Sequence, residues 1–276
     1  MTTRLNRPAG LRTTSVGEHR LTYIPDGSVQ LDPRRWYHET DPSIWDGEHA
    51  GLLDPEGYLA ASIGGLLVEH GDRAMLIDAG FGPRTIPAAH THPALGVLGG
   101  GDLPTGLKQA GVDPARIDTV ALTHVHDDHF GWVLRPGPAG TPFPNAAVAA
   151  GAADWAAWRE PVAVPTKAVH DGDEVFPGVT AMAAPGHTPG HTCYVIESGG
   201  ERLIAFGDAL HSPAQAAHPE WPVLMDVDRV RGIESRRRVL AALAQDGVRG
   251  FGIHFADVQF GRIISGPDGP YWEYDD

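Results

Sequence analysis

Short apolar runs alternate with glycine- and proline-rich turns along most of the chain. Residues 62–68 and 74–77 are rich in aliphatic side chains and are joined by the turn His70-Gly71-Asp72, a pattern that predicts a β-hairpin. A glycine-rich turn over residues 78–82 follows the second strand. The same reasoning predicts further strands at residues 21–24, 29–31, 117–123, 146–150, 179–183, 192–197, 203–206 and 251–255, and a closing hairpin over residues 260–274 around Pro267-Asp268-Gly269.

Helical patterns separate several of these strands. Residues 103–110 form a short helical pattern that ends at Gly111, and residues 152–158 are rich in alanine. Asp228 is typical of a helix N-cap, and apolar residues then recur at helical spacing as far as Ala244. Strands followed by helices predict a layered α/β fold. The long irregular stretch over residues 32–57 is typical of a functional loop.

Composition narrows the class of protein. Apolar residues make up 42% of the 276 residues, enough for a folded core in one sizeable domain. Lys and Arg number 21 against 35 Asp and Glu, a net charge of −14, so we expect no nucleic-acid and no membrane partner. The single cysteine, Cys193, excludes a disulfide framework and a cysteine-rich zinc module, and we interpret it as a core residue.

The first residues are polar and carry Arg4, Arg7 and Arg12 without an apolar segment behind them. This pattern predicts a flexible tail over residues 1–14, followed by a single domain over residues 15–276 and a cytoplasmic location. The run Arg236-Arg237-Arg238 falls on the predicted C-terminal helix and is interpreted as a solvated basic face.

A cluster of metal-ligand residue types follows the predicted strand 117–123. His124 and His126 are two residues apart, so on an extended chain they project to the same side. If the chain turns at once, Asp128 and His129 are carried round to face the same small space. Imidazole and carboxylate groups without a thiolate suit Zn²⁺, and also Mn²⁺, Fe²⁺ or Co²⁺. The alternative is a polar turn whose histidines face water.

Further candidates favour the metal site over that alternative. His187 lies in a Pro/Gly-rich loop between two predicted strands, and Asp208 follows the strand 203–206. His254 lies in the strand 251–255. Each candidate is at or just past the C-terminal end of a strand, and open α/β sheets collect their ligands along that edge.

The series His124-x-His126-x-Asp128-His129, then His187, Asp208 and His254, resembles the metallo-β-lactamase superfamily. The resemblance implies an αββα sandwich, with two mixed sheets flanked by helices and a dinuclear site at the sheet edge. It implies that His124, His126 and His187 hold one metal ion and that Asp128, His129 and His254 hold the other. Asp208 would bridge the two ions, and Asp78 would support the ligands without binding metal.

The bridging position that the resemblance gives to Asp208 distinguishes this chain from the true β-lactamases, because they lack that carboxylate. The stretch from residue 172 to His211 is more similar to the branch that contains N-acyl homoserine lactonases and methyl parathion hydrolase. The lactonase pattern places a tyrosine three residues after the bridging aspartate, where this chain has His211. This departure leans toward the methyl parathion hydrolase side of the branch.

The resemblance implies a hydrolase in which a hydroxide shared by two divalent ions, Zn²⁺ in the first instance, attacks a small uncharged lactone or ester. Asp128 or Asp208 would pass a proton to the leaving oxygen, and His211 would hydrogen-bond the oxyanion. The alternatives are a phosphotriesterase, a glyoxalase-II-type thioesterase and a non-catalytic metal-binding module. The expected partner is a small-molecule substrate, and the aromatic residues of loop 32–57 suit either a pocket wall or a homodimer contact.

Overall fold

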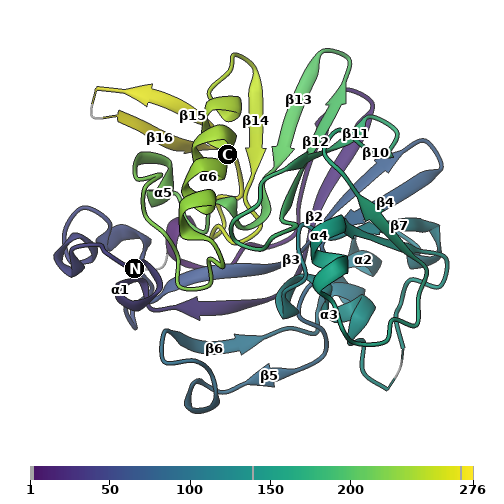
Figure 1. Ribbon diagram of the computed structural model, residues 1–276, viewed down its shortest axis with the longest axis horizontal. Helices are drawn as coiled ribbons and strands as arrows, with labels where there is room; N and C mark the ends of the chain where they lie inside the picture. Colours follow the sequence, from purple (N-terminus) through teal and green to yellow (C-terminus); the bar gives the residue numbers. More distant parts are fainter. Residues whose placement is uncertain (1–2, 139, 268, 276) are drawn as a thin grey trace.

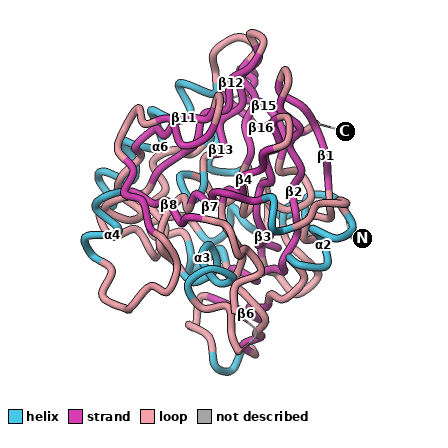
Figure 2. Tube along the Cα trace, turned by 90° about the vertical axis from the view of Figure 1, so that its right-hand side faces the viewer, coloured by secondary structure: helices cyan, strands magenta, loops and turns pink. Residues whose placement is uncertain are grey.

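Two β-sheets packed face to face form the centre of the molecule, and helices cover their outer faces (Figures 1 and 2). The computed structural model describes residues 3–138, 140–267 and 269–275. This arrangement confirms the predicted αββα sandwich. Both sheets are mixed, because each contains parallel as well as antiparallel pairs of neighbouring strands.

The first sheet has nine strands within the described residues, in the order β5-β6-β2-β3-β4-β7-β8-β9, with β1 paired to β2. Its strands are β1 (Arg12–Val16), β2 (His19–Leu31), β3 (Leu59–His70), β4 (Arg73–Ile77), β5 (Thr85–Ile86), β6 (Leu95–Gly99), β7 (Ile117–Ala121), β8 (Ala147–Gly151) and β9 (Thr166–Val169).

The second sheet has seven strands in sequence order over the same described ranges. They are β10 (Glu174–Phe176), β11 (Val179–Ala183), β12 (Thr192–Ser198), β13 (Glu201–Ala205), β14 (Val248–Phe251), β15 (Phe260–Gly266) and β16 (Gly269–Tyr274). The predicted closing hairpin is therefore confirmed, and Asp268 at its turn lies outside the described residues.

The helices are short except for the last. They are α1 (Pro33–Trp36), α2 (Leu103–Gln109), α3 (Asp127–Leu134), α4 (Ala152–Ala157), α5 (Ala214–Ala217) and α6 (Arg229–Leu243), with 3-10 turns η1 (Arg4–Asn6), η2 (Pro42–Trp45), η3 (Ala50–Leu52), η4 (Ala88–His90), η5 (Pro114–Arg116) and η6 (Gly207–Ala209). As predicted, Asp228 caps α6, accepting a hydrogen bond from the backbone N–H of Arg231 at 3.1 Å.

The main core lies between the two sheets. Leu21, Tyr23 and Leu66 of the first sheet meet Tyr194 and Leu203 of the second, and all five are fully buried. Each such side chain contributes about 1.5–3 kcal/mol to folding. Cys193 is also fully buried, and burial raises the pKa of its thiol to about 12, so it is the inert core residue that the sequence predicted.

The N-terminal segment differs from the sequence-based expectation. Residues 12–16 form β1 rather than a tail, and the three arginines all approach one buried carboxylate, that of Asp257. The shortest of these ion pairs joins Arg7 to Asp257 at 2.6 Å. The prediction of a flexible tail is therefore wrong for residues 4–14, because charge pairing and strand pairing hold them. Met1 and Thr2 lie outside the described residues.

Other corrections are local. The two strands predicted at residues 21–24 and 29–31 are parts of one continuous strand, β2, with an irregularity at residues 25–27. The stretch 32–57 contains α1, η2 and η3, and the strand predicted at 251–255 ends at Phe251, so that His254 lies in the following loop. Within the described residues, none of the helices combines the length and the apolar character that spanning a bilayer requires.

Candidate metal centre

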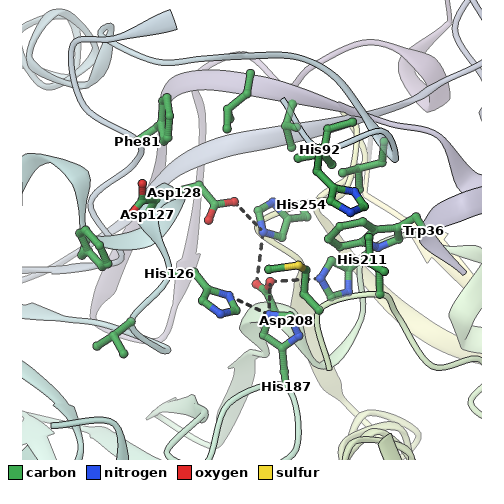
Figure 3. Close-up of a pocket in the computed structure, with 18 of the residues that line it drawn as sticks. Trp36, Phe81, His92, His126, Asp127, Asp128, His187, Asp208, His211 and His254 are labelled. Atoms are coloured by element: carbon green, nitrogen blue, oxygen red, sulfur yellow. Dashed lines mark hydrogen bonds and ion pairs between the residues drawn. The ribbon is translucent and has the colours of Figure 1, made fainter. Parts of the chain in front are cut away.

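The seven predicted ligands come from four segments of the chain and lie together at one edge of the sandwich. His124 and His126 follow β7, His187 lies between β11 and β12, Asp208 follows β13, and His254 follows β14. Figure 3 shows the labelled ligand side chains pointing toward one another. The side chains form two groups, and within each group the potential ligand atoms lie within 4.8 Å of one another. The first group is His124, His126, His187 and Asp208, and the second is Asp128, His129 and His254.

The immediate turn on which the expected position of Asp128 and His129 depends is the start of α3. His126 is the N-cap in an extended conformation, and the helix begins at Asp127. The backbone N–H of His129 donates to the carbonyl of His126 at 3.0 Å. This turn brings Asp128 and His129 round to the second group, as predicted, and it places two acidic side chains at the positive end of the helix.

Asp208 lies between the two groups. Its Oδ1 is 3.2 Å from His129 Nε2 and 3.2 Å from His254 Nε2. Its Oδ2 is 3.2 Å from His187 Nε2. One carboxylate thus directs one oxygen to each group, which is the geometry of a bridging ligand.

The outward nitrogen of three of these imidazoles is fixed by an acceptor. His129 Nδ1 donates to Asp78 Oδ2 at 2.9 Å, and His254 Nδ1 donates to the carbonyl of Ser62 at 2.9 Å. His187 Nδ1 faces Asp226 Oδ1 at 3.1 Å. With one proton held on Nδ1, the neutral form of each ring directs its Nε2 lone pair to the centre, which is how metal-binding histidines are oriented.

These lone pairs face one another, so the residues fit a cation. His129 Nε2 and His254 Nε2 are only 3.2 Å apart, and His187 Nε2 is 3.1 Å from His126 Nδ1. Asp208 Oδ1 is buried and has no hydrogen-bond partner among the described residues. Leaving such groups unpaired costs free energy that a bound cation offsets. Nitrogen and carboxylate donors without sulfur suit a divalent metal ion.

The protonation pattern follows from the same charges. Burial opposes a proton on His129, but the carboxylates of Asp208 and Asp78 outweigh it and raise the pKa of His129 to about 10. The pKa of His187 is raised to about 9 in the same way, chiefly by Asp208. At His126 burial and the nearby His187 outweigh the carboxylates of Asp128 and Asp208, and its pKa falls to about 4. The acidic side chains therefore attract positive charge to the centre.

Asp78 supports the centre without joining either ligand group, as the resemblance implies. Its Oδ1 accepts the backbone N–H of Thr123 at 2.7 Å, which fixes the start of the ligand loop. Asp78 has a φ of 60°, a left-handed conformation that aspartate tolerates better than most residues. This backbone geometry turns its carboxylate toward both Thr123 and His129.

Two supporting carboxylates, Asp26 and Asp226, were missed by the sequence analysis. Asp26 is fully buried and accepts five hydrogen bonds: two from the glycine-rich turn after β4, two from the backbone of residues 101 and 103, and one from the indole of Trp132. Asp226 binds His187 and is 3.6 Å from Arg236.

Arg236 is buried, so the prediction of a solvated basic face is wrong at this position. Its guanidinium donates to the carbonyls of Ala209, Pro219 and Trp221, which replace the water that it loses. Arg236 lies on the same face of α6 as the buried Val239, Leu240 and Leu243. That i, i+3, i+4, i+7 spacing is the signal that marked the position as buried.

An apolar cavity of about 380 Å³ opens on the ligand cluster (Figure 3). His211 lines it, so this side chain does face the site. Trp36 and Phe81 also line it, whereas Tyr37, Trp45 and Trp221 stack behind it in a buried aromatic group. Most of the remaining wall is apolar, formed by Val29, Leu31, Leu95, Leu98, Val125, Phe130, Trp158, Leu224 and Met225, and polar side chains outside the ligand cluster come from His92, Asp127 and Arg135.

Comparison with known proteins identifies the family. The sequence profile of the metallo-beta-lactamase superfamily matches residues 66–248, which is more than half of the chain, so the chain belongs to this superfamily. With the two His/Asp clusters, this makes the protein a metal-dependent hydrolase. A search among curated proteins finds no match.

Several solved structures share the fold over nearly the whole chain. The hydrolase AbOPH of the beta-lactamase superfamily is 24% identical, with 98% of this chain and 100% of that chain covered and a TM-score of 0.78. AidC, a dizinc quorum-quenching lactonase in complex with N-hexanoyl-L-homoserine, is 22% identical, with 98% and 99% covered and a TM-score of 0.81. AiiA from B. thuringiensis, with N-decanoyl-L-homoserine bound, is 21% identical, with 87% and 94% covered and a TM-score of 0.63.

Proposed function

We propose that this chain is a dinuclear metal-dependent hydrolase that opens a small uncharged lactone or cleaves an ester with an apolar substituent. The observation that carries the proposal is the position of Asp208, with one oxygen toward each ligand group and an apolar cavity beside it. A carboxylate between two His-rich sites would hold two divalent ions close enough to share one water.

The two ions would be held by the groups already described. His124, His126 and His187 supply the first site, Asp128, His129 and His254 supply the second, and Asp208 serves both. The absence of sulfur from these groups favours Zn²⁺ and also admits Mn²⁺, Fe²⁺ or Co²⁺. When bound, two such ions lower the pKa of a shared water toward about 7 and polarise a substrate carbonyl.

The chain's own residues manage the proton and the substrate oxygen. Asp128 is the more exposed of the two central carboxylates, with 25% of its side chain accessible against 5% for Asp208. Asp128 is therefore placed to receive a proton and deliver it to the leaving alkoxide. Burial and the adjacent imidazoles act in opposite directions on Asp128, and the net effect lowers its pKa, so it starts as a carboxylate.

His211 is placed to hydrogen-bond the substrate oxygen. Burial lowers the pKa of His211 to about 4, so its ring is neutral at neutral pH. Its Nε2 lies 3.1 Å from Asp208 Oδ2, and the ring stacks on His254 with 5.5 Å between the ring centroids. This packing holds the one N–H of the neutral ring on Asp208, and a substrate oxygen that binds beside this carboxylate would share or take over that hydrogen bond as charge develops on it.

The cavity wall supports an apolar substituent on the substrate. Aliphatic and aromatic side chains make most of the wall, and polar groups gather at the ligand cluster. A fatty acyl chain or an aromatic ring fills such a space. AidC and AiiA, with acyl homoserine products bound, support a lactone as the substrate, whereas His211 at the position of the lactonase tyrosine supports testing phosphotriesters as the second candidate.

The experiment combines metal content with turnover of a panel of lactones, aryl esters and phosphotriesters. We expect two metal ions per chain and a chelator-sensitive activity that is highest on lactones or esters with apolar substituents. Asp208→Ala should remove turnover and lower the occupancy of both sites, and His211→Ala should reduce the rate while both ions stay bound. His170→Ala, an exposed residue, is the control. Fewer than one ion per chain, or full activity in chelator, would overturn the proposal.

A further inference from the structure

A third group of potential ligands lies outside the candidate metal centre. Glu48, His49 and His218 each offer one ligand atom, and these three atoms lie within 4.8 Å of one another. Glu48 and His49 belong to the loop between η2 and η3, whereas His218 directly follows α5. Two segments that are far apart in sequence therefore meet at this point.

The two histidines have unpaired nitrogens. Both His49 Nε2 and His218 Nε2 are buried atoms without a hydrogen-bond partner among the described residues. Buried polar atoms are normally paired, so two neighbouring exceptions call for an occupant. The His49 side chain is 11% exposed and that of His218 is 26% exposed, so both rings are largely enclosed.

The outward nitrogen of His218 is oriented as in the main centre. Its Nδ1 lies 3.4 Å from Glu220 Oε1. A carboxylate at this position holds the proton on Nδ1 and leaves a lone pair on Nε2, just as Asp78 does for His129. Burial also lowers the pKa of His49, which favours its neutral form, the form that binds metal ions.

Aromatic packing fixes both rings. His218 stacks on Trp221 with 4.0 Å between the ring centroids and an angle of 2°. His49 meets Trp221 edge-on at 5.7 Å and His218 edge-on at 5.6 Å. The two imidazole ligand atoms are therefore held in place before an ion arrives, which reduces the ordering cost of binding.

We propose that Glu48, His49 and His218 form a peripheral site for one divalent transition-metal ion. Two imidazoles and one carboxylate suit Zn²⁺, Ni²⁺ or Cu²⁺. Glu48 is 66% exposed, so the site opens to solvent and water completes the coordination. We expect weaker binding here than at the main centre, because only three protein ligands are present and one of them is mobile in solvent.

An ion at this site would join the loop that precedes η3 to the segment that carries His211. Gln215 Nε2 donates to the carbonyl of Trp221 at 3.1 Å, and Gln215 Oε1 accepts the backbone N–H of His211 at 2.7 Å. Binding would therefore stiffen one wall of the cavity. The inference does not depend on the proposed hydrolytic reaction.

The test is equilibrium dialysis against graded free Zn²⁺, with the zinc per chain measured by mass spectrometry. The unmodified chain should bind one more ion than His49→Ala or His218→Ala, whereas His170→Ala, the matched control, should keep it. Because Glu48 is exposed, Glu48→Gln leaves the core intact and keeps the proposal testable if a histidine variant fails to fold. We expect Glu48→Gln to weaken the binding of this additional zinc ion at least about tenfold and to leave the binding of the two ions at the main centre unchanged. Equal stoichiometry and affinity in Glu48→Gln and the unmodified chain would overturn the proposal.

Discussion

Asp26 gathers five hydrogen bonds, and replacing it with asparagine removes only part of them. Asp26 Oδ1 accepts the backbone N–H groups of Gly101 and Leu103 at 3.0 Å each and the indole N–H of Trp132 at 2.7 Å. Asp26 Oδ2 accepts the backbone N–H groups of Phe81 and Gly82 at 2.7 and 3.1 Å. In Asp26→Asn the amide oxygen can take the place of Oδ1 and keep its three hydrogen bonds. The amide NH₂ then replaces Oδ2 and faces the N–H donors of Phe81 and Gly82, so those two hydrogen bonds are lost.

The magnitude follows from the two bonds that are lost. Hydrogen bonds to a charged acceptor contribute about 1.5–3 kcal/mol each, so Asp26→Asn should lower the free energy of unfolding by about 3–6 kcal/mol. That is a large share of the about 5–15 kcal/mol that stabilises a typical domain. The turn next to Asp78 should loosen as well, since Phe81 and Gly82 lie in it.

Urea unfolding followed by tryptophan fluorescence measures this loss, with and without added zinc. Asp118→Asn is the matched control, because Asp118 pairs with Arg73 at the surface at 2.8 Å. Surface ion pairs contribute about 0–1 kcal/mol, so the control should stay close to the unmodified chain. A loss below about 1 kcal/mol for Asp26→Asn would show that the five bonds do not hold the turn as argued.

Two further predictions concern the buried charges around the centre. Arg236→Met leaves the buried carboxylate of Asp226 without its cation and should lower the free energy of unfolding in urea by about 3–5 kcal/mol. Arg237→Met, at an exposed neighbour on α6, is the control and should leave that free energy unchanged. Equal stability of the two variants would contradict this account. Because the pKa values of His129 and His187 are raised to about 10 and about 9, the metal-free chain carries protons there at about pH 7, so zinc binding should release protons and tighten as the pH rises toward 9. Calorimetry in buffers of different ionisation enthalpy measures the release, and a buffer-independent heat would refute it.

The clustering of the candidate ligands was predictable because each lies beside a strong local signal. His124, His126, Asp128 and His129 share six residues after an apolar strand, and the three distant ligands each lie near the end of a strand pattern. The sheet then brings those strand ends to one edge. The αββα layering was predictable for a related reason, since it follows from the order of strands and helices and from the resemblance.

The supporting residues were hidden because their partners are remote in sequence. Asp26 binds groups 55 to 106 positions away, and no period or motif marks such a contact. The N-terminal arginines were misjudged for the same reason, since Asp257 lies about 250 positions further along. The burial of Arg236 could have been predicted, because its helical spacing with Val239, Leu240 and Leu243 is visible in the sequence. Its positive charge led to the prediction of an exposed position instead.

The ion pairs of Arg4, Arg7 and Arg12 with Asp257 have a consequence for folding during synthesis. Arg7 binds Asp257, three positions beyond His254, and the backbone N–H of Ala9 donates to the hydroxyl of Ser62, whose carbonyl holds the His254 ring. Arg4 also lies over the ring of Tyr274 at 4.9 Å. Arg7 therefore gains this partner only after Asp257, about 250 positions further along, has been synthesised. A growing polypeptide can bring His124, His126, His187 and Asp208 together before His254 is made, so the second ligand group is completed only after the first.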